Sequence, residues 1–502
     1  MRLDDLSAGL PGDLFRGGGE TEITDIAFDS RKAAPGCLFV CVPGMTADGH
    51  EFAPAAVAAG ASALVVEREL DLGVPQLLVP DARAAMAPLA ARLFGDPSAA
   101  MDCVAVTGTN GKTTTAFLVR AILEGTGRRC GLLGTVMQIV GGREEEVERT
   151  TPEAIDLQRV LRRMADAGDA ACVMEVSSHA LVLGRADAIH FDAAAFTNLT
   201  QDHLDFHADM EDYFAAKRLL FAPPEGARGL LPGAAAVNVD DPYGARLAEE
   251  LSAIGSPPLT TFSPSGRSEA TLAAADVEFD ASGTRFRLRV AGGEELPVSL
   301  RLPGHFNVEN ALAALACAGA IGIDLGAAVA ALAGAEPVPG RMEPIDEGQS
   351  FGVLVDYAHT PDSLENVLDA ARKLTDGRLI SVFGCGGDRD PLKRPLMGRA
   401  GAELSDVPIV TSDNPRSEDP DAIIEQVLAG IPAAARDAVV VEPDRRAAIA
   451  RALAEAHAGD LVVVAGKGHE QGQEFEAGRK IPFDDRDVCR EELSRLQVGG
   501  SA

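Results

Sequence analysis

The sequence predicts an α/β fold built from three domains. A chain of 502 residues is too long for one hydrophobic core, and at about 100–200 residues per domain it divides into about three units. Short apolar segments alternate with helix-like segments along most of the chain, which is typical of parallel sheets with crossover helices. Turn-forming clusters at 95–98 and 336–340 interrupt this alternation and predict domains spanning residues 1–98, 99–337 and 338–502.

Composition excludes several classes of protein. Hydrophobic residues make up 46% and charged residues 24% of the chain, close to the averages for globular proteins. The formal net charge of -31, without a run of five Lys or Arg, opposes binding to nucleic acid and to anionic membranes. No basic and apolar leader begins the chain, and no apolar run approaches the roughly 18 residues that span a bilayer. The eight cysteines are scattered without a C-x-x-C pair, which predicts free, buried thiols in a reducing compartment. We therefore expect a cytoplasmic monomer without nucleic-acid or membrane partners.

Each predicted unit has its own pattern. The first has short strands over 37–42, 63–66 and 76–79 and one Ala-rich helix. The second begins with a strand over 102–106, a glycine loop, a helix over 113–123 and a strand over 171–176. Later, apolar Phe286, Leu288 and Val290 alternate with arginines, as in a β-hairpin, and an Ala-rich helix over 308–322 closes the unit.

The last unit repeats the alternation of strands and helices. It has strands over 352–355, 379–383, 409–412 and 461–464, and helices over 364–374 and 423–428. This order predicts a second, doubly wound domain.

A glycine-rich loop is the strongest chemical signal. It consists of Gly108, Thr109, Asn110, Gly111, Lys112, Thr113 and Thr114. Because it joins a predicted strand to a predicted helix, its backbone N–H groups and the helix N-terminus can cradle phosphates. Lys112 can neutralise β and γ oxygens, and Thr113 can reach a magnesium ion. The usual G-x-x-x-x-G-K-T spacing has glycine where this chain has Val106, so the loop is a variant. The alternative is a tight glycine turn capped by threonines.

Two further polar segments follow predicted strands. Glu175 comes at the end of one strand and His203 lies in the segment after another. Open α/β sheets bind ligands at the carboxyl ends of their strands, and a carboxylate with an imidazole can complete magnesium shells that ATP oxygens share. Each residue taken alone is also compatible with an exposed loop or a helix cap.

Over nearly its whole length the chain resembles the Mur ligases. The resemblance rests on the glycine loop, on segments 175–179, 198–205, 302–307 and 356–359, on Gly340-Arg341, and on segment 466–470. Folylpolyglutamate synthases share part of this set, but segments 29–32, 35–40 and 48–50 resemble the uridine-nucleotide domain of the tripeptide-forming Mur ligases.

The resemblance implies an ATP-dependent amide ligase of peptidoglycan precursor synthesis, with ATP and two magnesium ions as cofactors. It implies that the carboxylate of UDP-MurNAc-L-Ala-D-Glu attacks ATP to give an acyl phosphate, which the amine of meso-diaminopimelate then displaces. The Asp413-Asn414-Pro415-Arg416 segment resembles the signature of enzymes that add diaminopimelate rather than lysine.

The resemblance also implies roles for particular residues. Catalytic roles fall on Lys112, His203 and Lys217, the last as a carbamylated lysine. Metal contacts fall on Thr113, Glu175, His203 and Lys217. Beyond the glycine loop, ATP contacts fall on Asn307, Arg341, Asp356 and His359. Contacts to the UDP substrate fall on Ser30, Thr150, Thr151, Ser177 and Arg185. The amino acid is expected at Arg389, Asp413, Asn414, Pro415, Arg416, Gly466 and Glu470.

Two departures and two alternatives accompany this interpretation. Arg149 stands where asparagine is common in the family, and Met45-Thr46 replace polar residues of some relatives. One alternative is a different Mur ligase or a folate ligase, which a substrate panel would distinguish. The other is a nucleotide-dependent switch protein, which would not need two further substrates to release ADP.

Overall fold

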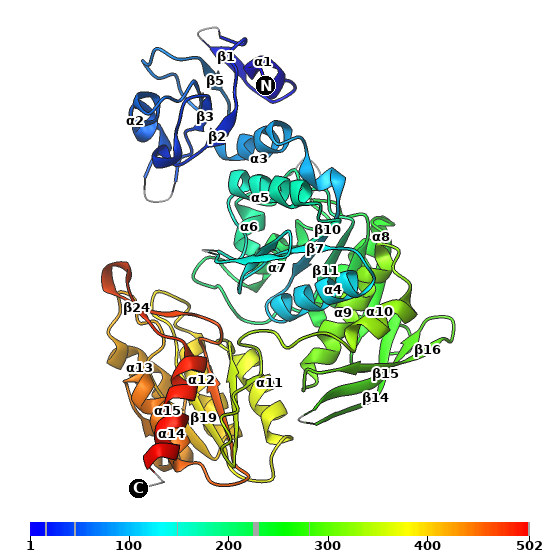
Figure 1. Ribbon diagram of the computed structural model, residues 1–502, viewed down its shortest axis with the longest axis vertical. Coiled ribbons are helices and arrows are strands. Elements are labelled where there is room, and N and C mark those ends of the chain that lie inside the picture. Colours follow the sequence, from blue (N-terminus) through cyan, green and yellow to red (C-terminus); the bar gives the residue numbers. More distant parts are fainter. Residues whose placement is uncertain (16–17, 45–46, 148, 224–229, 281, 500–502) are drawn as a thin grey trace.

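The computed structural model describes residues 1–15, 18–44, 47–147, 149–223, 230–280 and 282–499. Three large sheets follow one another along the chain, with five, eleven and six strands, and a two-stranded ribbon lies near the C-terminus. The three sheets form successive parts of an elongated molecule (Figure 1). This confirms the predicted α/β class.

The first sheet has the order β1-β5-β4-β3-β2. Its strands are β1 (Asp13–Phe15), β2 (Asp25–Ala27), β3 (Cys37–Val40), β4 (Ala63–Val66) and β5 (Gln76–Leu78). Its helices are α1 (Leu3–Ser7), α2 (Ala53–Ala58) and α3 (Ala82–Leu93). Helix α3 begins where the Asp81 side chain accepts a hydrogen bond from the Ala84 N–H at 2.8 Å, an N-cap. Met86 and Leu89 of α3 share a core with Ile155 of the next unit, so apolar packing connects the two units.

The central sheet has the order β16-β15-β14-β13-β12-β11-β6-β10-β7-β8-β9. Its strands are β6 (Asp102–Thr107), β7 (Cys130–Leu133), β8 (Gln138–Val140), β9 (Arg143–Glu145), β10 (Ala171–Glu175), β11 (Ala193–Phe196), β12 (Ala235–Asn238), β13 (Leu259–Ser263), β14 (Leu272–Asp280), β15 (Gly283–Val290) and β16 (Glu295–Leu300). Strand β6 pairs in parallel with β10 on one side and β11 on the other. Their carboxyl ends therefore meet at one edge.

Helices cover both faces of this sheet. They are α4 (Lys112–Gly125), α5 (Ala154–Ala167), α6 (Ser178–Val182), α7 (Met210–Arg218), α8 (Pro242–Ile254), α9 (Phe306–Ala320) and α10 (Leu325–Leu332). The predicted hairpin is part of β14, β15 and β16, which pair antiparallel. Phe286 and Leu288 are buried, as the alternation predicts. Helix α9 begins two residues before its predicted start, at the turn after Gly304.

The last large sheet has the order β17-β18-β22-β19-β20-β21. Its strands are β17 (Glu343–Pro344), β18 (Gly352–Asp356), β19 (Leu379–Phe383), β20 (Val407–Val410), β21 (Val440–Val441) and β22 (Leu461–Ala465), and the ribbon is β23 (Gly472–Phe475) with β24 (Arg479–Pro482). Its helices are α11 (Pro361–Arg372), α12 (Lys393–Leu404), α13 (Pro420–Ala429), α14 (Arg445–Glu455) and α15 (Asp485–Gly499). Separate apolar cores lie on its two faces, which confirms the doubly wound prediction.

Several boundaries in this unit differ from their predictions, among them those of α11 and β20. Helix α11 begins three residues before the predicted start at 364, because Thr360 and Ser363 form a capping box and Pro361 occupies the first turn. Strand β20 covers Val407–Val410 rather than 409–412. The polar residues after Val410 belong to the loop that leaves the sheet.

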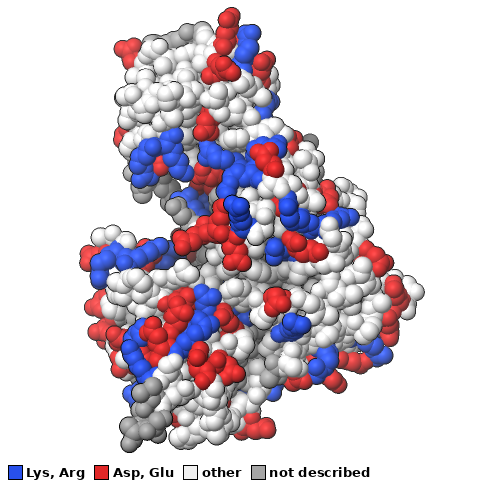
Figure 2. Space-filling model, in the orientation of Figure 1, with Lys and Arg blue, Asp and Glu red and all other residues white. Residues whose placement is uncertain are grey.

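All eight cysteines are free and buried, as predicted. Among the described helices, none has the length and apolar character needed to cross a bilayer. Acidic and basic side chains are mixed over the face shown in Figure 2, and a notch separates the first unit from the last.

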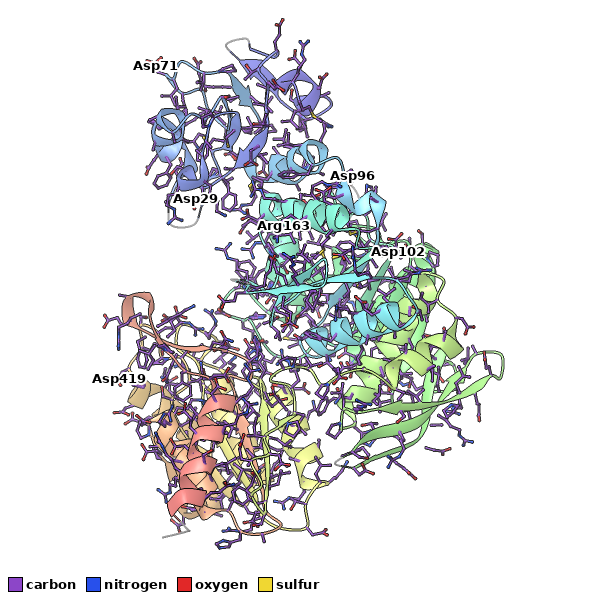
Figure 3. The ribbon with its side chains drawn as sticks, viewed as in Figure 1. Asp29, Asp71, Asp96, Asp102, Arg163 and Asp419 are labelled. Atoms are coloured by element: carbon purple, nitrogen blue, oxygen red, sulfur yellow. The ribbon has the colours of Figure 1, made fainter. Side chains whose placement is uncertain are left out.

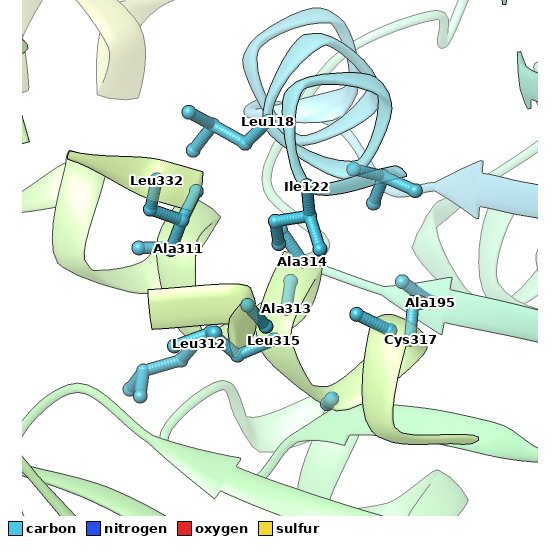
Figure 4. Close-up of a cluster of buried hydrophobic side chains, with 14 of the residues drawn as sticks. Leu118, Ile122, Ala195, Ala311, Leu312, Ala313, Ala314, Leu315, Cys317 and Leu332 are labelled. Atoms are coloured by element: carbon cyan, nitrogen blue, oxygen red, sulfur yellow. The ribbon is translucent and has the colours of Figure 1, made fainter. Parts of the chain in front are cut away.

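The central core depends on the packing of α4 against α9. Ile122 of α4 is fully buried and points toward Ala314 and its neighbours on α9 (Figure 4). We expect Ile122→Ala to lower the free energy of unfolding by about 2–5 kcal/mol, because it removes buried methyl groups and leaves a cavity. Urea unfolding followed by circular dichroism would measure this. Ile254→Ala is the matched control, since Ile254 is 57% exposed, and an equal effect of both changes would contradict the prediction.

Candidate active site

The glycine loop joins β6 to α4 and is held by the segment that follows β11. Thr109 N donates to Asn198 O at 2.9 Å, and Asn110 N donates to Asn198 Oδ1 at 2.8 Å. Gly108 has φ of 151°, and a Cβ there would lie 1.9 Å from Thr197 Oγ1. Only glycine fits this position, so the loop conformation is built into the sequence.

The side chains that follow the loop gather at the carboxyl ends of β6 and β10. Lys112 Nζ donates to Gly108 O at 3.0 Å and Thr109 O at 2.8 Å. Thr113 Oγ1 donates to Glu175 Oε2 at 3.0 Å, and Thr135 N donates to Glu175 Oε1 at 2.8 Å. Thr114 is buried on the first turn of α4. The predicted proximity of Thr113 and Glu175 is therefore found in the structure.

Lys217 reaches the same loop from α7. Its side chain is buried, and its Nζ donates to Gly108 O at 2.8 Å, the carbonyl that also accepts from Lys112. The ammonium lies 4.6 Å from the centre of the Tyr213 ring. Burial, together with the nearby charge of Lys112, lowers the pKa of Lys217 well below its ordinary value. A neutral amine is therefore accessible there.

Asp202 connects the central unit to the last unit, although the sequence reasoning did not single it out. Its carboxylate lies 3.5 Å from His203 Nε2, 3.9 Å from His359 Nε2 and 3.6 Å from Lys393 Nζ. Burial alone would raise the pKa of Asp202, but its interactions with His203, Lys393 and His359 outweigh burial and lower the pKa. Burial lowers the pKa of His203 to about 3, so this imidazole is neutral, as a metal ligand must be.

Arg341 brings the last unit into contact with the glycine loop. Its Nη2 donates to Thr113 Oγ1 at 3.1 Å, and its guanidinium lies 4.4 Å from the centre of the Tyr357 ring. Asn110 Nδ2 donates to Asp362 Oδ2 at 2.6 Å. The two units therefore meet directly at the phosphate loop.

Asn307 and Asp356, which were expected to contact ATP, make hydrogen bonds within the protein. Asn307 Nδ2 donates to Pro303 O at 2.8 Å, and its Oδ1 accepts from Asn310 Nδ2 at 3.0 Å. Asn310, which the sequence reasoning did not assign, has its Oδ1 2.3 Å from where a Cβ of Gly111 would lie. Asp356 accepts from the backbone N–H of Met342 and of Ala358, each at 2.7 Å. Asp356 therefore supports the backbone next to Arg341, and Asn307 supports Asn310, which packs against the glycine loop.

A cavity of about 1170 Å³ lies between the central and last units. Its lining includes six of the seven residues expected for the amino acid, Arg389, Asp413, Asn414, Arg416, Gly466 and Glu470, together with Thr150, His203 and His359. One cavity therefore runs from the strand ends beside the phosphate loop to the last sheet.

The far end of this cavity is rich in paired charges. Arg416 has φ of 49°; its Nε donates to Glu474 Oε2 at 3.1 Å and its Nη1 to Gly387 O at 2.7 Å. Lys467 is fully buried, and its Nζ donates to Asn414 Oδ1 at 3.0 Å and Glu470 Oε2 at 2.8 Å. Sequence reasoning missed Lys467, although the Gly-Lys-Gly-His-Glu segment was a possible signal.

Close backbone approach fixes the geometry here. A Cβ on Gly466 would lie 2.7 Å from Asp413 Oδ2, and one on Gly387 would lie 2.0 Å from Pro415 O. Arg389 is exposed, with Nη1 bound to Asp388 O at 2.9 Å. The loops after β19 and β20 therefore touch through their backbones.

Residues expected to contact the UDP substrate lie at two places. Thr151 Oγ1 donates to Glu175 O at 2.9 Å and accepts from Ser177 N at 3.2 Å, close to the strand end. Arg185 pairs with Glu153 at 2.8 Å, and Arg149 pairs with the same carboxylate at 2.9 Å.

Ser30 lies in the first unit, outside the described lining of the cavity. Its neighbour Asp29 lies on the edge of that unit that faces the notch (Figure 3). Met45 and Thr46 are outside the described residues. The uridine end of the expected site is thus separate from the cavity.

A glycine loop between a parallel strand and a helix, facing a second α/β unit across a charged cavity, is the arrangement of the P-loop class of enzymes. Residues 22–93 match the Mur ligase family catalytic domain, 106–318 the Mur ligase middle domain and 340–468 the Mur ligase glutamate ligase domain. The chain belongs to the Mur ligase family.

Individual relatives cover almost the whole chain. The UDP-N-acetylmuramoyl-L-alanyl-D-glutamate--2,6-diaminopimelate ligase of Streptomyces coelicolor is 47% identical over 95% of this chain and 94% of its own. The ligase of the same name from Syntrophomonas wolfei is 46% identical over 98% and 99%. A solved structure of a ligase of that name has a TM-score of 0.69 at 32% identity and covers 99% of both chains. Folylpolyglutamate synthase of Mycobacterium tuberculosis, at 20% identity and a TM-score of 0.60, shares the fold.

Proposed function

We propose that the protein is an ATP-dependent ligase that adds meso-diaminopimelate to UDP-MurNAc-L-Ala-D-Glu in peptidoglycan precursor synthesis. The observation that carries this proposal is the single cavity of about 1170 Å³, with His203 at its phosphate-loop side and Arg416 on the last unit. The full-length relatives named for this reaction support it. A ligase needs its phosphate donor and its incoming amine on one reaction path, and a cavity that extends from His203 to Arg416 supports such a path.

The reaction has two steps. A carboxylate oxygen of the UDP substrate attacks the γ-phosphorus of ATP, and ADP leaves, giving an acyl phosphate. The amine of diaminopimelate then attacks the acyl carbon, and after it loses a proton, inorganic phosphate leaves with the carbon–oxygen electron pair. Lys112 and the loop N–H groups stabilise charge on the transferring phosphoryl group. Contact between Arg341 and Thr113 brings the last unit over the loop, which excludes water from the acyl phosphate.

Magnesium fits the residues at the strand ends. Glu175 is 1% exposed and its carboxylate faces Thr113, an arrangement of hard oxygen donors that suits this ion. Within the described residues no group of three His, Cys, Asp or Glu side chains could hold a metal. We assign Thr113, Glu175, His203 and carbamylated Lys217 as the residues that would hold two magnesium ions. When bound, the ions neutralise phosphate charge.

The remaining assignments belong to the same proposal. Ser30, Thr150, Thr151, Ser177 and Arg185 bind the UDP substrate, and Asn307, Arg341, Asp356 and His359 act on ATP directly or by supporting the loop. We place the domain boundaries at 98/99 and 337/338 and propose a monomer that acts in the cytoplasm.

A phosphate-release assay with the UDP-dipeptide and a panel of amino acids tests the function. We expect release to require ATP, the UDP-dipeptide and meso-diaminopimelate together. ATP hydrolysis without the other two substrates would indicate a nucleotide switch instead. Preference for a folate or for another UDP-peptide would indicate a different ligase of the same fold.

Lys217→Ala should lower the turnover rate on the order of a hundredfold or more, because the carbamate that would hold a magnesium ion is lost. Carbon dioxide reacts only with a neutral amine, and burial of Lys217 lowers its pKa. Short carboxylic acids should restore part of the activity by replacing the carbamate. Lys373→Ala is the control, since Lys373 is exposed. Full activity of Lys217→Ala, or an absence of rescue, would contradict carbamylation.

A further inference from the structure

An ion pair that the proposed mechanism does not use joins the loops carrying Arg389 and Arg416. Arg394, on α12, has a side chain that is 1% exposed. Its Nη1 donates to Glu418 Oε2 and its Nη2 to Glu418 Oε1, each at 2.8 Å. The same guanidinium donates to Gln426 Oε1 at 2.9 Å and to Gly386 O at 3.2 Å. Two parallel charged hydrogen bonds fix both distance and orientation.

Glu418 connects this guanidinium to both loops. Its Oε1 also accepts from Asp388 N at 2.6 Å, the backbone N–H next to Arg389. Its own N–H donates to Pro415 O at 3.0 Å, next to Arg416. Burial would raise the pKa of Glu418, but its hydrogen bonds with Arg394 dominate and lower it. Glu418 therefore contacts the neighbour of Arg389 through its carboxylate and the neighbour of Arg416 through its backbone N–H.

A second set of hydrogen bonds, between Asp388 and Ser417, lies beside this ion pair. Asp388 Oδ1 accepts from Ser417 Oγ at 2.6 Å and Asp388 Oδ2 accepts from Ser417 N at 3.2 Å. Asp388 and Arg416 have φ of 52° and 49°, in the left-handed region that non-glycine residues rarely adopt. Such conformations persist where surrounding contacts hold them. The hydrogen bonds of the Arg394–Glu418 and Asp388–Ser417 pairs supply these contacts.

We propose that Arg394 and Glu418 are positioning residues that set the separation and orientation of Arg389 and Arg416, and so determine selectivity for an amino acid with a second carboxylate. The inference rests on the proposed function. A guanidinium fork grips a carboxylate only when it is held within about half an ångström of the right place. Arg416 has its Nε on Glu474 and one Nη1 hydrogen on Gly387 O, so its outer Nη1 and Nη2 edge remains for the substrate. Loss of the Arg394–Glu418 or Asp388–Ser417 hydrogen bonds would turn that guanidinium edge away from the substrate carboxylate.

Substitution of Arg394 or Glu418 tests whether this pair positions the two arginines or only stabilises the fold. Glu418→Gln keeps the shape and removes the charge, and Arg394→Lys removes the second hydrogen bond. We expect KM for meso-diaminopimelate to rise about ten- to a hundredfold, with KM for ATP and for the UDP-dipeptide unchanged. The ratio of kcat/KM for diaminopimelate to that for lysine should fall by a similar factor, because lysine does not use the fork.

Asp460→Asn is the matched control. Arg378 donates to Asp460 Oδ2 from Nε at 3.0 Å and from Nη2 at 2.7 Å, at the opposite ends of β19 and β22 in the same unit. This variant should leave the selectivity ratio unchanged. Ser417→Ala removes the side-chain hydrogen bond between Ser417 and Asp388. It should also lower the selectivity ratio, and it replaces Glu418→Gln as the test variant if that protein does not fold.

An unchanged ratio in folded Glu418→Gln or Ser417→Ala protein, or an equal loss for every substrate, would overturn the inference. Failure of the proposed function gives a different result: the unmodified protein would join neither amino acid to the UDP-dipeptide, and the inference would fall with it.

Discussion

Lys112→Ala is expected to lower the rate of acyl-phosphate formation on the order of a hundredfold or more. The Lys112 ammonium lies against Gly108 O and Thr109 O, at the mouth of the phosphate loop. Burial lowers its pKa, and the nearby Glu175 charge opposes that shift. Removing the cation leaves the developing phosphoryl charge without its nearest side-chain partner. Single-turnover measurement of ADP formation with the UDP-dipeptide would record the loss.

Affinity for the UDP-dipeptide tests whether the loop acts on phosphate alone. Titration of this substrate into the unmodified protein and the Lys112→Ala variant should give similar dissociation constants. Thr151 and Ser177, which we assign to that substrate, are hydrogen-bonded to each other and to the end of β10 and do not depend on Lys112. A large loss of affinity would show that the loop has another role.

The phosphate end of the site was predictable because it depends on local sequence and on sheet topology. Buried apolar runs predicted β6 and β10, and parallel strands place their carboxyl ends together. Thr113 and Glu175, 62 positions apart, are therefore in contact. The glycine at 108 is a local requirement, since a Cβ would meet Thr197.

Elements shaped by tertiary contact were not predictable in the same way. Helix α12 contains Pro395, Gly398 and Gly401, and its intrinsic helix propensity is poor. A Cβ on Gly398 would lie 2.0 Å from Val427 O, and one on Gly401 2.2 Å from the Phe383 ring. These glycines let the helix pack closely, so residues that weaken a helix in isolation are required in this fold. The short ribbon of β23 and β24, with its charged residues, also lacks a strand pattern.

The sequence also did not predict which charged residues pair with partners that lie far away along the chain. Asp202, Arg394 and Lys467 each bind groups far away in the sequence, and a single sequence carries no signal for such pairings. Lys467 changes the expected amino-acid site, because its ammonium already contacts Glu470 and lies 3.9 Å from Asp413. A substrate ammonium placed at Asp413 and Glu470 would therefore share these carboxylates with an internal cation.

Selectivity for meso-diaminopimelate over lysine is the largest effect we expect. The two amino acids differ by one carboxylate and its stereocentre, and Arg416 lines the cavity where that carboxylate would lie. Bound lysine would leave the guanidinium edge desolvated without an anion. Sites built to hydrogen-bond a substrate group reject analogues that lack it by roughly 10⁴ to 10⁵.

Comparison of kcat/KM for the two amino acids would measure this selectivity, with Arg416→Ala and Arg416→Lys alongside the unmodified protein. Arg416→Ala should lose most of its use of diaminopimelate, because no other group replaces the fork. Arg416→Lys should recover only part of it, since an ammonium is a point charge without the paired geometry. Arg446→Ala, which removes an exposed pair with Glu491, is the control and should behave as the unmodified protein. Equal use of lysine by the unmodified protein, or undiminished use of diaminopimelate by Arg416→Ala, would exclude Arg416 as the carboxylate receptor.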